Sequence, residues 1–289
     1  MRRLRSEQTG LSYLCSGAQN APLVLCLHGF PDIPRTWAPL TERLCGAGYR
    51  VVSPWLPGYA PSSPNGPFDL ATLARTILGF IDELSPSEPI RIVGHDWGSL
   101  IAQCAMALHP DRFRAAALLA VPHILAFEAN IERYPRQIGR SAYMLLFRIP
   151  ALSGRIVRLG NFRFIERLWE TWSPGFHPGG DYFEELKVCL RSSMPTPIKY
   201  YRALLSPKIV LEVRRMVGAD PIVVPTIYLH GERDGCVGPK IADDQEKHFS
   251  ALFEMVKLAD AGHFLHLERP REAVSYTHLT LPTITSGCG

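Results

Sequence analysis

The chain has 289 residues, of which 46% are hydrophobic and 20% are charged, and its formal net charge is +4. This composition is typical of a globular protein, and so small a charge, scattered along the chain, argues against nucleic-acid binding. No run of about eighteen consecutive apolar residues occurs, which excludes a helix that spans a membrane.

Seven cysteines are scattered along the chain, with no C-x-x-C pair and no metal-ligand spacing to the histidines. Thiols in this arrangement are typical of a reducing compartment, so we expect a cytoplasmic protein. No metal and no other cofactor is indicated. The expected partners are a small apolar substrate and water, and the sequence leaves a homodimer open.

Strand-like and helix-like segments alternate over residues 1–121, which we interpret as the first part of an α/β core. Such alternation favours a mostly parallel, doubly wound sheet. The expected strands are 11–15, 23–27, 50–55, 90–93 and 114–121, and the expected helices are 36–48, 68–84 and 99–108.

Residues 122–217 differ from the segments around them, because helical patterns with interleaved aromatic residues and arginines replace the strand-like runs. We interpret this segment as a helical cap inserted over the sheet. Residues 218–274 then return to the core pattern, with expected strands at 226–230 and 252–258 and an expected helix at 239–248.

Residues 275–289 do not suit the fold. A helix is expected to begin near residue 268, but the sequence from Ser275 onward is rich in threonine and contains Pro282. Threonine and proline are poor helix formers. We therefore expect residues 275–289 to be a non-native or disordered tail.

The sequence Gly94-His95-Asp96-Trp97-Gly98 lies between an apolar run and a helix-like segment. Two glycines around a central residue have the spacing of a nucleophile elbow, a sharp turn that presents one side chain to a substrate. Asp96 stands at the centre, and an aspartate nucleophile forms an ester that must later be hydrolysed. Alternatively, Asp96 only caps the following helix.

Three further sequences follow expected strands and supply what such a nucleophile needs. His28-Gly29-Phe30-Pro31 offers the Phe30 amide to an anion hole, together with the amide of Trp97. Asp234 ends Gly231-Glu232-Arg233-Asp234 and can orient a histidine. His263 follows Gly262 and can act as a general base on water.

Residues 9–274 resemble the α/β-hydrolases of the epoxide hydrolase and haloalkane dehalogenase branch, and epoxide hydrolase-like proteins most of all. The resemblance rests on H-G-F-P-D at 28–32, G-H-D-W-G-S at 94–99, G-E-R-D at 231–234 and G-H-F at 262–264. It implies an α/β-hydrolase fold with a helical cap. It also implies that Asp96 is the nucleophile, that His263 activates water and that Asp234 orients His263.

Epoxide hydrolases of this branch protonate the opened epoxide with tyrosines of the cap. Lys199-Tyr200-Tyr201-Arg202 resembles the late-cap segment of that family, which places the matching phenol on Tyr201. In the early-cap segment the family tyrosine is expected just before Phe147, where this chain has Leu146. Either Tyr143, about one helical turn earlier, replaces it, or Tyr201 acts alone, or the substrate is not a typical epoxide.

The resemblance leaves two alternatives to an epoxide hydrolase. A haloalkane dehalogenase would use the same three triad residues with the Trp97 indole at the halide, although Phe30 stands where such enzymes usually carry a second donor. A ligand-binding protein with little turnover is the other alternative. Trp97 and Leu100 stand where haloacetate-specific relatives carry arginines, which favours an uncharged, apolar substrate.

Overall fold

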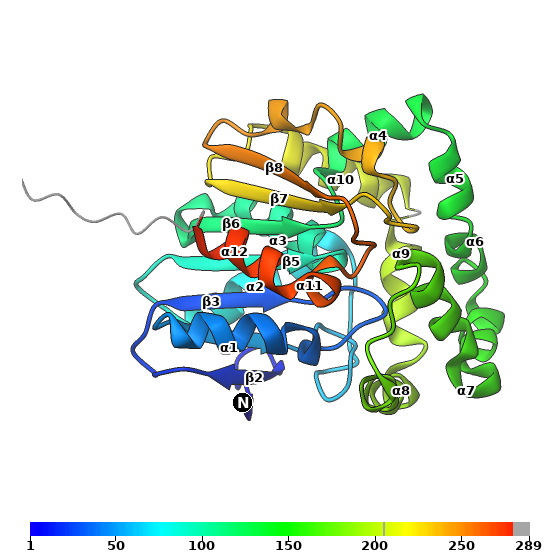
Figure 1. Ribbon diagram of the computed structural model, residues 1–289, viewed down its shortest axis with the longest axis horizontal. Coiled ribbons are helices and arrows are strands. Elements are labelled where there is room, and N and C mark those ends of the chain that lie inside the picture. The colour runs from blue at the N-terminus through cyan, green and yellow to red at the C-terminus, as the bar shows by residue number, and fades with distance from the viewer. Residues whose placement is uncertain (205, 280–289) are drawn as a thin grey trace, which may run out of the picture.

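The computed structural model describes residues 1–204 and 206–279, which form one eight-stranded sheet with helices on both faces and a helical cap at one end (Figure 1). The strands are ordered β1-β2-β4-β3-β5-β6-β7-β8 across the sheet. All neighbouring pairs from β4 to β8 are parallel, whereas β1-β2 and β2-β4 are antiparallel. The predicted α/β class with a mostly parallel sheet is confirmed.

The central strands are short apolar runs that are buried on both faces, as is usual for parallel strands covered by helices. All five residues of β3 and all six residues of β5 are buried. The strands are β1 (Arg2–Arg5), β2 (Ser12–Ser16), β3 (Leu23–Leu27), β4 (Arg50–Pro54), β5 (Ile90–His95), β6 (Phe113–Leu119), β7 (Thr226–Gly231) and β8 (Phe253–Leu258).

Strand β1 was not expected from the sequence. Its four residues are all exposed, and three of them are arginines, so hydrophobic periodicity gives no signal there. Charged side chains are a common feature of strands at the edge of a sheet.

Helices cover both faces of the sheet, with α1, α11 and α12 on the face toward the viewer in Figure 1 and α2 and α3 on the other. Helix α2 begins at Leu70 because the Asp69 carboxylate accepts a hydrogen bond from the Thr72 amide (2.9 Å) and caps the helix. These helices are α1 (Ala38–Gly46), α2 (Leu70–Leu84), α3 (Trp97–Leu108), α11 (Leu265–Glu268) and α12 (Pro270–Leu279).

The segment between β6 and β7 forms the cap, most of which lies beside the carboxyl ends of the parallel strands (right side of Figure 1), whereas its last helix, α10, packs against α3 and α2 of the core. Helix α7 is interrupted at Gly160–Phe162, where three residues have positive φ. The cap helices are α4 (Ile124–Arg133), α5 (Arg136–Arg140), α6 (Tyr143–Phe147), α7 (Pro150–Trp172), α8 (Gly180–Ser193), α9 (Lys199–Ala203) and α10 (Pro207–Gly218).

Two further segments differ from the sequence-based expectations. The helix expected at 239–248 is two short 3₁₀ turns, Pro239–Ala242 and Gln245–His248. The Asn130 side-chain amide donates to the Ile241 and Asp243 carbonyls, and Asp244 adopts a left-handed conformation, so the α-helical bonding is replaced there.

Helix α12 continues through residues 275–279, which were expected to belong to the tail. Residues 280–289 of the expected tail lie outside the described residues. Within residues 1–204 and 206–279, no helix combines the length and the apolar character that crossing a membrane requires.

Candidate active site

Asp96 occupies the sharp turn between β5 and α3. Its backbone has φ 52° and ψ −115°, in the sparsely populated region that a nucleophile elbow imposes on its central residue. Glycine is required at position 98, because a Cβ atom there would collide with the carbonyl of Leu27 on β3. The Asp96 side chain makes no capping hydrogen bond to α3, which argues against the interpretation of Asp96 as a helix cap.

The Asp96 carboxylate is held by the loop after β3. The Phe30 amide donates a hydrogen bond to Asp96 Oδ1 (2.8 Å). This approach needs glycine at position 29, because a Cβ atom there would overlap the Asp96 side chain. Trp97 is the first residue of α3, and the first amides of a helix have no acceptor within the helix. Both expected anion-hole residues therefore adjoin Asp96.

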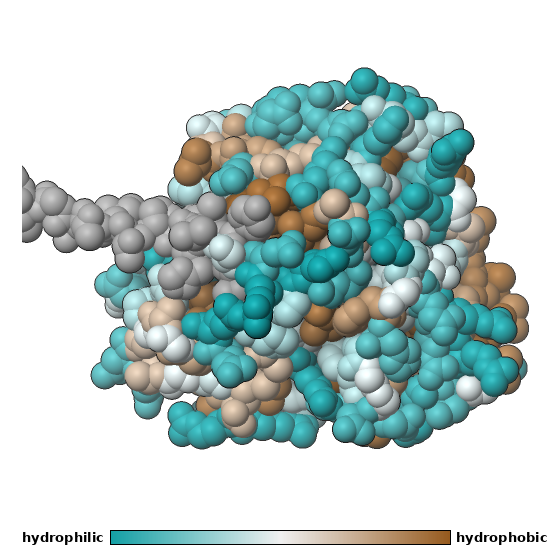
Figure 2. Space-filling view, viewed as in Figure 1, coloured by the Kyte–Doolittle hydropathy of each residue, from teal (hydrophilic) through white to brown (hydrophobic). Residues whose placement is uncertain are grey.

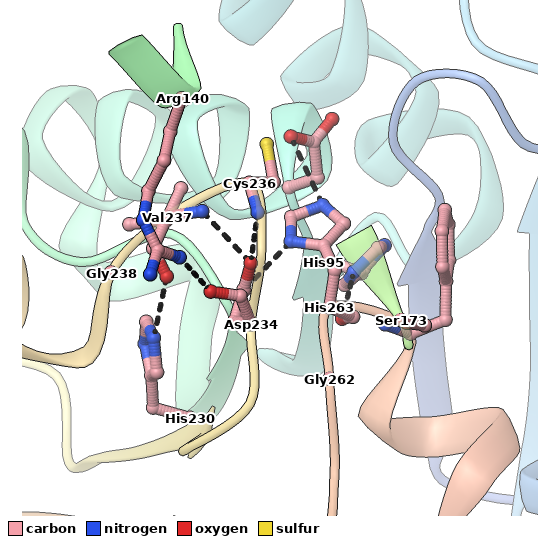
Figure 3. Close-up of polar contacts among 12 residues, drawn as sticks. His95, Arg140, Ser173, His230, Asp234, Cys236, Val237, Gly238, Gly262 and His263 are labelled. Carbon is pink, nitrogen blue, oxygen red and sulfur yellow. Dashed lines mark hydrogen bonds and ion pairs between the residues drawn. The ribbon is translucent and has the colours of Figure 1, made fainter. Parts of the chain in front are cut away.

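His263 lies between two carboxylates. Its Nδ1 atom is 2.8 Å from Asp234 Oδ2, and its Nε2 atom is 3.6 Å from Asp96 Oδ2. The second oxygen of Asp234 accepts hydrogen bonds from the amides of Cys236 (2.7 Å) and Val237 (2.8 Å), as Figure 3 shows. Asp234 is thus fixed by its own loop and holds the Nδ1–H tautomer of His263, which leaves Nε2 toward Asp96.

The end of cap helix α7 supports both loops of this arrangement. The Trp172 carbonyl accepts hydrogen bonds from the amides of Gly235 and His263, each 3.0 Å long. The next residue, Ser173, accepts a hydrogen bond from the Phe264 amide (3.0 Å). The cap is therefore bonded directly to the segments that carry Asp234 and His263.

The two carboxylates determine the protonation state of His263. Complete burial favours the neutral imidazole, but the charge and hydrogen bond of Asp234, together with Asp96, outweigh burial and raise the pKa of His263 to about 10. Near neutral pH the resting site therefore contains an imidazolium. Its pKa must fall when the Asp96 charge is lost, because one of the stabilising carboxylates then disappears.

We expect Asp234→Asn to lower the pKa of His263, because the variant removes a charge while keeping an oxygen for the Cys236 and Val237 amides. Histidine NMR signals followed against pH measure this directly. The pKa of His263 is about 6.5 in the unfolded chain and about 10 in the folded protein. The stability that His263 contributes is therefore complete below about pH 6.5 and is lost as the pH rises through about 10. Loss of stability between pH 7 and 10 should therefore be smaller in Asp234→Asn than in wild type, and an unchanged His263 titration would contradict the argument.

A cavity of about 250 Å³ opens onto Asp96 from beneath the cap. Its walls are mostly apolar, which suits an uncharged substrate. The lining residues come from the core, from cap helices α4 to α6 and from α9 and α10, and include Leu70, Leu100, Ile124, Phe127, Met144, Val213 and Cys236.

Tyr143 and Tyr201 both line this cavity together with Asp96 and Trp97. Their rings pack edge to face with centroids 5.7 Å apart, and the Tyr201 ring also packs on Trp97 at 5.0 Å. Burial, followed by the neighbouring acidic groups, raises the pKa of each phenol well above 10. Both hydroxyls are therefore protonated, and able to donate, throughout the physiological pH range.

Leu146, at the expected position of the family tyrosine, does not line the cavity; it is half-buried against the hydrophobic core. Tyr143, three residues earlier on α6, is the early-cap tyrosine that reaches it. Sequence reasoning did not single out Cys236, whose thiol lies 3.9 Å from the Tyr143 hydroxyl. Its position two residues after Asp234 is the only sequence signal for it.

Within the described ranges, one group of side chains offers ligand atoms that could hold a metal ion: Asp32, His95 and His266, whose atoms lie within 4.8 Å of one another. All three residues are buried, and His95 Nε2 is 2.9 Å from the carbonyl of His263. None of the three lines the cavity. A cation held there would lie behind the elbow and would not contact a substrate at Asp96.

Comparison with known proteins places this arrangement among related sequences. Residues 24–275 match the Alpha/beta hydrolase family. Epoxide hydrolase 3 of Siraitia grosvenorii is 33% identical over 308 residues, which cover 93% of this chain and 94% of that protein. Epoxide hydrolase 4 of Mus musculus is 26% identical over 93% of this chain and 75% of its own length.

Solved structures agree with the fold. An epoxide hydrolase of Bacillus megaterium in complex with an inhibitor has a TM-score of 0.84 at 21% identity, covering 97% of this chain and 99% of that one. Potato epoxide hydrolase I has a TM-score of 0.81 at 22% identity, covering 96% and 98%. At this identity the likeness concerns the fold alone, and it confirms the predicted fold class.

Proposed function

Because the chain belongs to the Alpha/beta hydrolase family and is an epoxide hydrolase-like enzyme, we propose that it converts an apolar epoxide to a vicinal diol through a covalent ester on Asp96. This proposal rests on one observation. A carboxylate and two protonated phenols share a single apolar cavity, so a nucleophile and an acid are available to the same small substrate.

In the first step, one oxygen of Asp96 attacks an epoxide carbon while the Phe30 amide holds the other oxygen. The carbon–oxygen bond of the epoxide breaks, and the departing oxygen takes a proton from Tyr201 or Tyr143. Proton donation matters because the alkoxide is otherwise a poor leaving group. The product of this step is a hydroxyalkyl ester of Asp96.

In the second step, His263 Nε2 removes a proton from water, which attacks the ester carbonyl carbon. Ester formation has removed the Asp96 charge, so the pKa of His263 falls and the imidazolium gives up its proton, which restores the phenol that donated in the first step. The neutral imidazole can then act as the base. The Phe30 and Trp97 amides are placed to stabilise the oxyanion that forms. Collapse of this intermediate breaks the bond between the Asp96 carbonyl carbon and the substrate oxygen, and that oxygen takes the remaining proton of the added water. The diol is released, the carboxylate and the imidazolium are restored, and the net reaction is epoxide plus water to diol.

Dehalogenation is less well supported by the same cavity. A departing halide needs hydrogen-bond donors around it, and Phe30 contributes no side-chain donor next to the Trp97 indole. The acid that Tyr143 and Tyr201 offer would have no use, since halide departs without a proton. Incubation with styrene oxide and with a bromoalkane, following diol and bromide, separates the two reactions. Bromide release without diol formation would contradict our proposal.

We expect Tyr201→Phe to lower kcat for styrene oxide by about 10²–10³-fold and Tyr143→Phe by about tenfold or more, because each removes a proton donor. Tyr200→Phe is the matched control, since the Tyr200 hydroxyl bonds the Pro57 carbonyl (2.6 Å) and does not line the cavity. Steady-state kinetics of the three variants provide the measurement. Unchanged turnover in Tyr201→Phe would remove Tyr201 from the mechanism.

A further inference from the structure

Residues 133–165 of the cap contain seven arginines and neither aspartate nor glutamate. The whole chain has 31 Lys and Arg against 27 Asp and Glu, so without these seven residues the rest of the chain would be acidic overall. The positive charge of the molecule is therefore concentrated on one short segment. It includes α5, α6 and the first turns of α7.

The same segment exposes large apolar side chains. Ile138, Leu145, Ile149 and Leu152 are exposed to 62%, 61%, 48% and 45%, and they follow one another at spacings of seven, four and three residues. Ile138 lies on α5, Leu145 on α6, Ile149 directly before α7 and Leu152 in the first turn of α7. Figure 2 shows hydrophobic surface at the right edge of the molecule, over α6 and α7. We call the exposed side chains of residues 136–163 the outer cap surface.

Several arginines of the outer cap surface have no partner. Arg136, Arg148, Arg155 and Arg163 are exposed, and none forms an ion pair or a side-chain hydrogen bond with a residue of 1–204 or 206–279. Arg158, in contrast, is engaged by the Met194 carbonyl. The unpaired guanidinium groups come from the same short segment as the exposed apolar side chains and remain available to an anionic partner.

We propose that the outer cap surface docks on an anionic lipid bilayer. Apolar side chains flanked by arginines are the arrangement by which peripheral helices insert into the headgroup region, where each basic residue near an anionic membrane adds to binding. A second copy of this chain fits less well. Two copies joined through this surface would bring unpaired guanidinium groups together with no carboxylate from residues 133–165 between them.

Docking by this surface would bring the cavity close to the membrane. Gln137, Ser141, Tyr143 and Met144 line the cavity from the inner side of α5 and α6, whereas Ile138 and Leu145 project from the outer side. Apolar epoxides concentrate in lipid. The outer cap surface would thus hold the substrate-binding side of the enzyme against the lipid in which its substrates concentrate. This role goes beyond the proposed reaction.

The test is flotation of the purified full chain with vesicles of phosphatidylcholine alone or of phosphatidylcholine mixed with phosphatidylserine, at low and high salt. We expect binding to the mixed vesicles that weakens with salt. The paired variants Arg148→Gln with Arg155→Gln, and Leu145→Ser with Ile149→Ser, should each weaken it about tenfold or more. Arg43→Gln with Leu252→Ser is the matched control, because both side chains are exposed outside the cap.

Two results would overturn the proposal: equal binding to neutral and mixed vesicles, or binding that neither paired variant weakens. A third such result would be a wild-type dimer, detected by size-exclusion chromatography, that dissociates in the paired variants. It would show that the outer cap surface joins two copies of the chain. Vesicle binding is measured without substrate, so its failure is distinct from a failure of epoxide hydrolysis. Circular dichroism spectra and thermal unfolding midpoints equal to those of wild type show that the variants are folded.

Discussion

Asp96→Ala is expected to lower epoxide turnover by about four to six orders of magnitude, because it removes the atom that forms the covalent bond. The fold should survive, since the Asp96 side chain makes no capping bond to α3 and its main partner is the Phe30 amide. Diol formation by Asp96→Ala and by Asp111→Ala, an exposed control on the turn before β6, provides the comparison.

A single turnover in water labelled with a heavy oxygen isotope distinguishes an Asp96 that attacks the substrate from an Asp96 that only activates water. In the proposed ester mechanism, the oxygen added to the substrate in a single turnover would come from the Asp96 carboxylate, and the label would enter Asp96. We therefore expect unlabelled diol and labelled protein. Labelled diol in the first turnover would show direct attack by water and would contradict the ester mechanism.

His263→Gln is expected to trap the ester. The first step needs Asp96 and a phenol, whereas the second needs a base on water, so the variant should react once and then stop. We expect steady-state turnover to fall by about 10²–10⁴-fold. Intact-protein mass spectrometry should show an added mass equal to that of one substrate molecule, located on the peptide that contains Asp96.

The exposed His109→Gln is the control for the His263 variant and should show neither the kinetic defect nor the added mass. Absence of an adduct at every time point, together with lost turnover, would indicate that His263 is needed before the ester forms. That outcome would contradict a first step that needs only Asp96 and a phenol.

The core could be predicted from the sequence because its signals are local. The apolar run before Gly94 and the glycines around Asp96 are contiguous in the chain, and they specify a strand, a turn and a helix without reference to distant residues. The chain order of Asp96, Asp234 and His263 placed these residues at the ends of three parallel strands. The structure brings them together at 2.8 and 3.6 Å.

The cap could not be predicted in the same detail, because its arrangement depends on contacts between residues far apart in the chain. Whether Tyr143 or Leu146 reaches the cavity is decided by how α6 packs on Tyr201 and Phe30, and no local pattern encodes that packing. The 3₁₀ turns near Ile241 have the same origin, since Asn130 lies more than one hundred residues earlier in the chain.

The hydrogen bonds to the Trp172 carbonyl have a consequence for motion. If the cap swung away as one rigid lid, the end of α7 would pull on the amides of Gly235 and His263, and His263 would lose its alignment with Asp96 and Asp234. This end of α7 is therefore a fixed pivot. We expect motion that opens the cavity to occur instead where α5, α6 and α10 border it, on the timescale of microseconds to milliseconds that is usual for loops and lids.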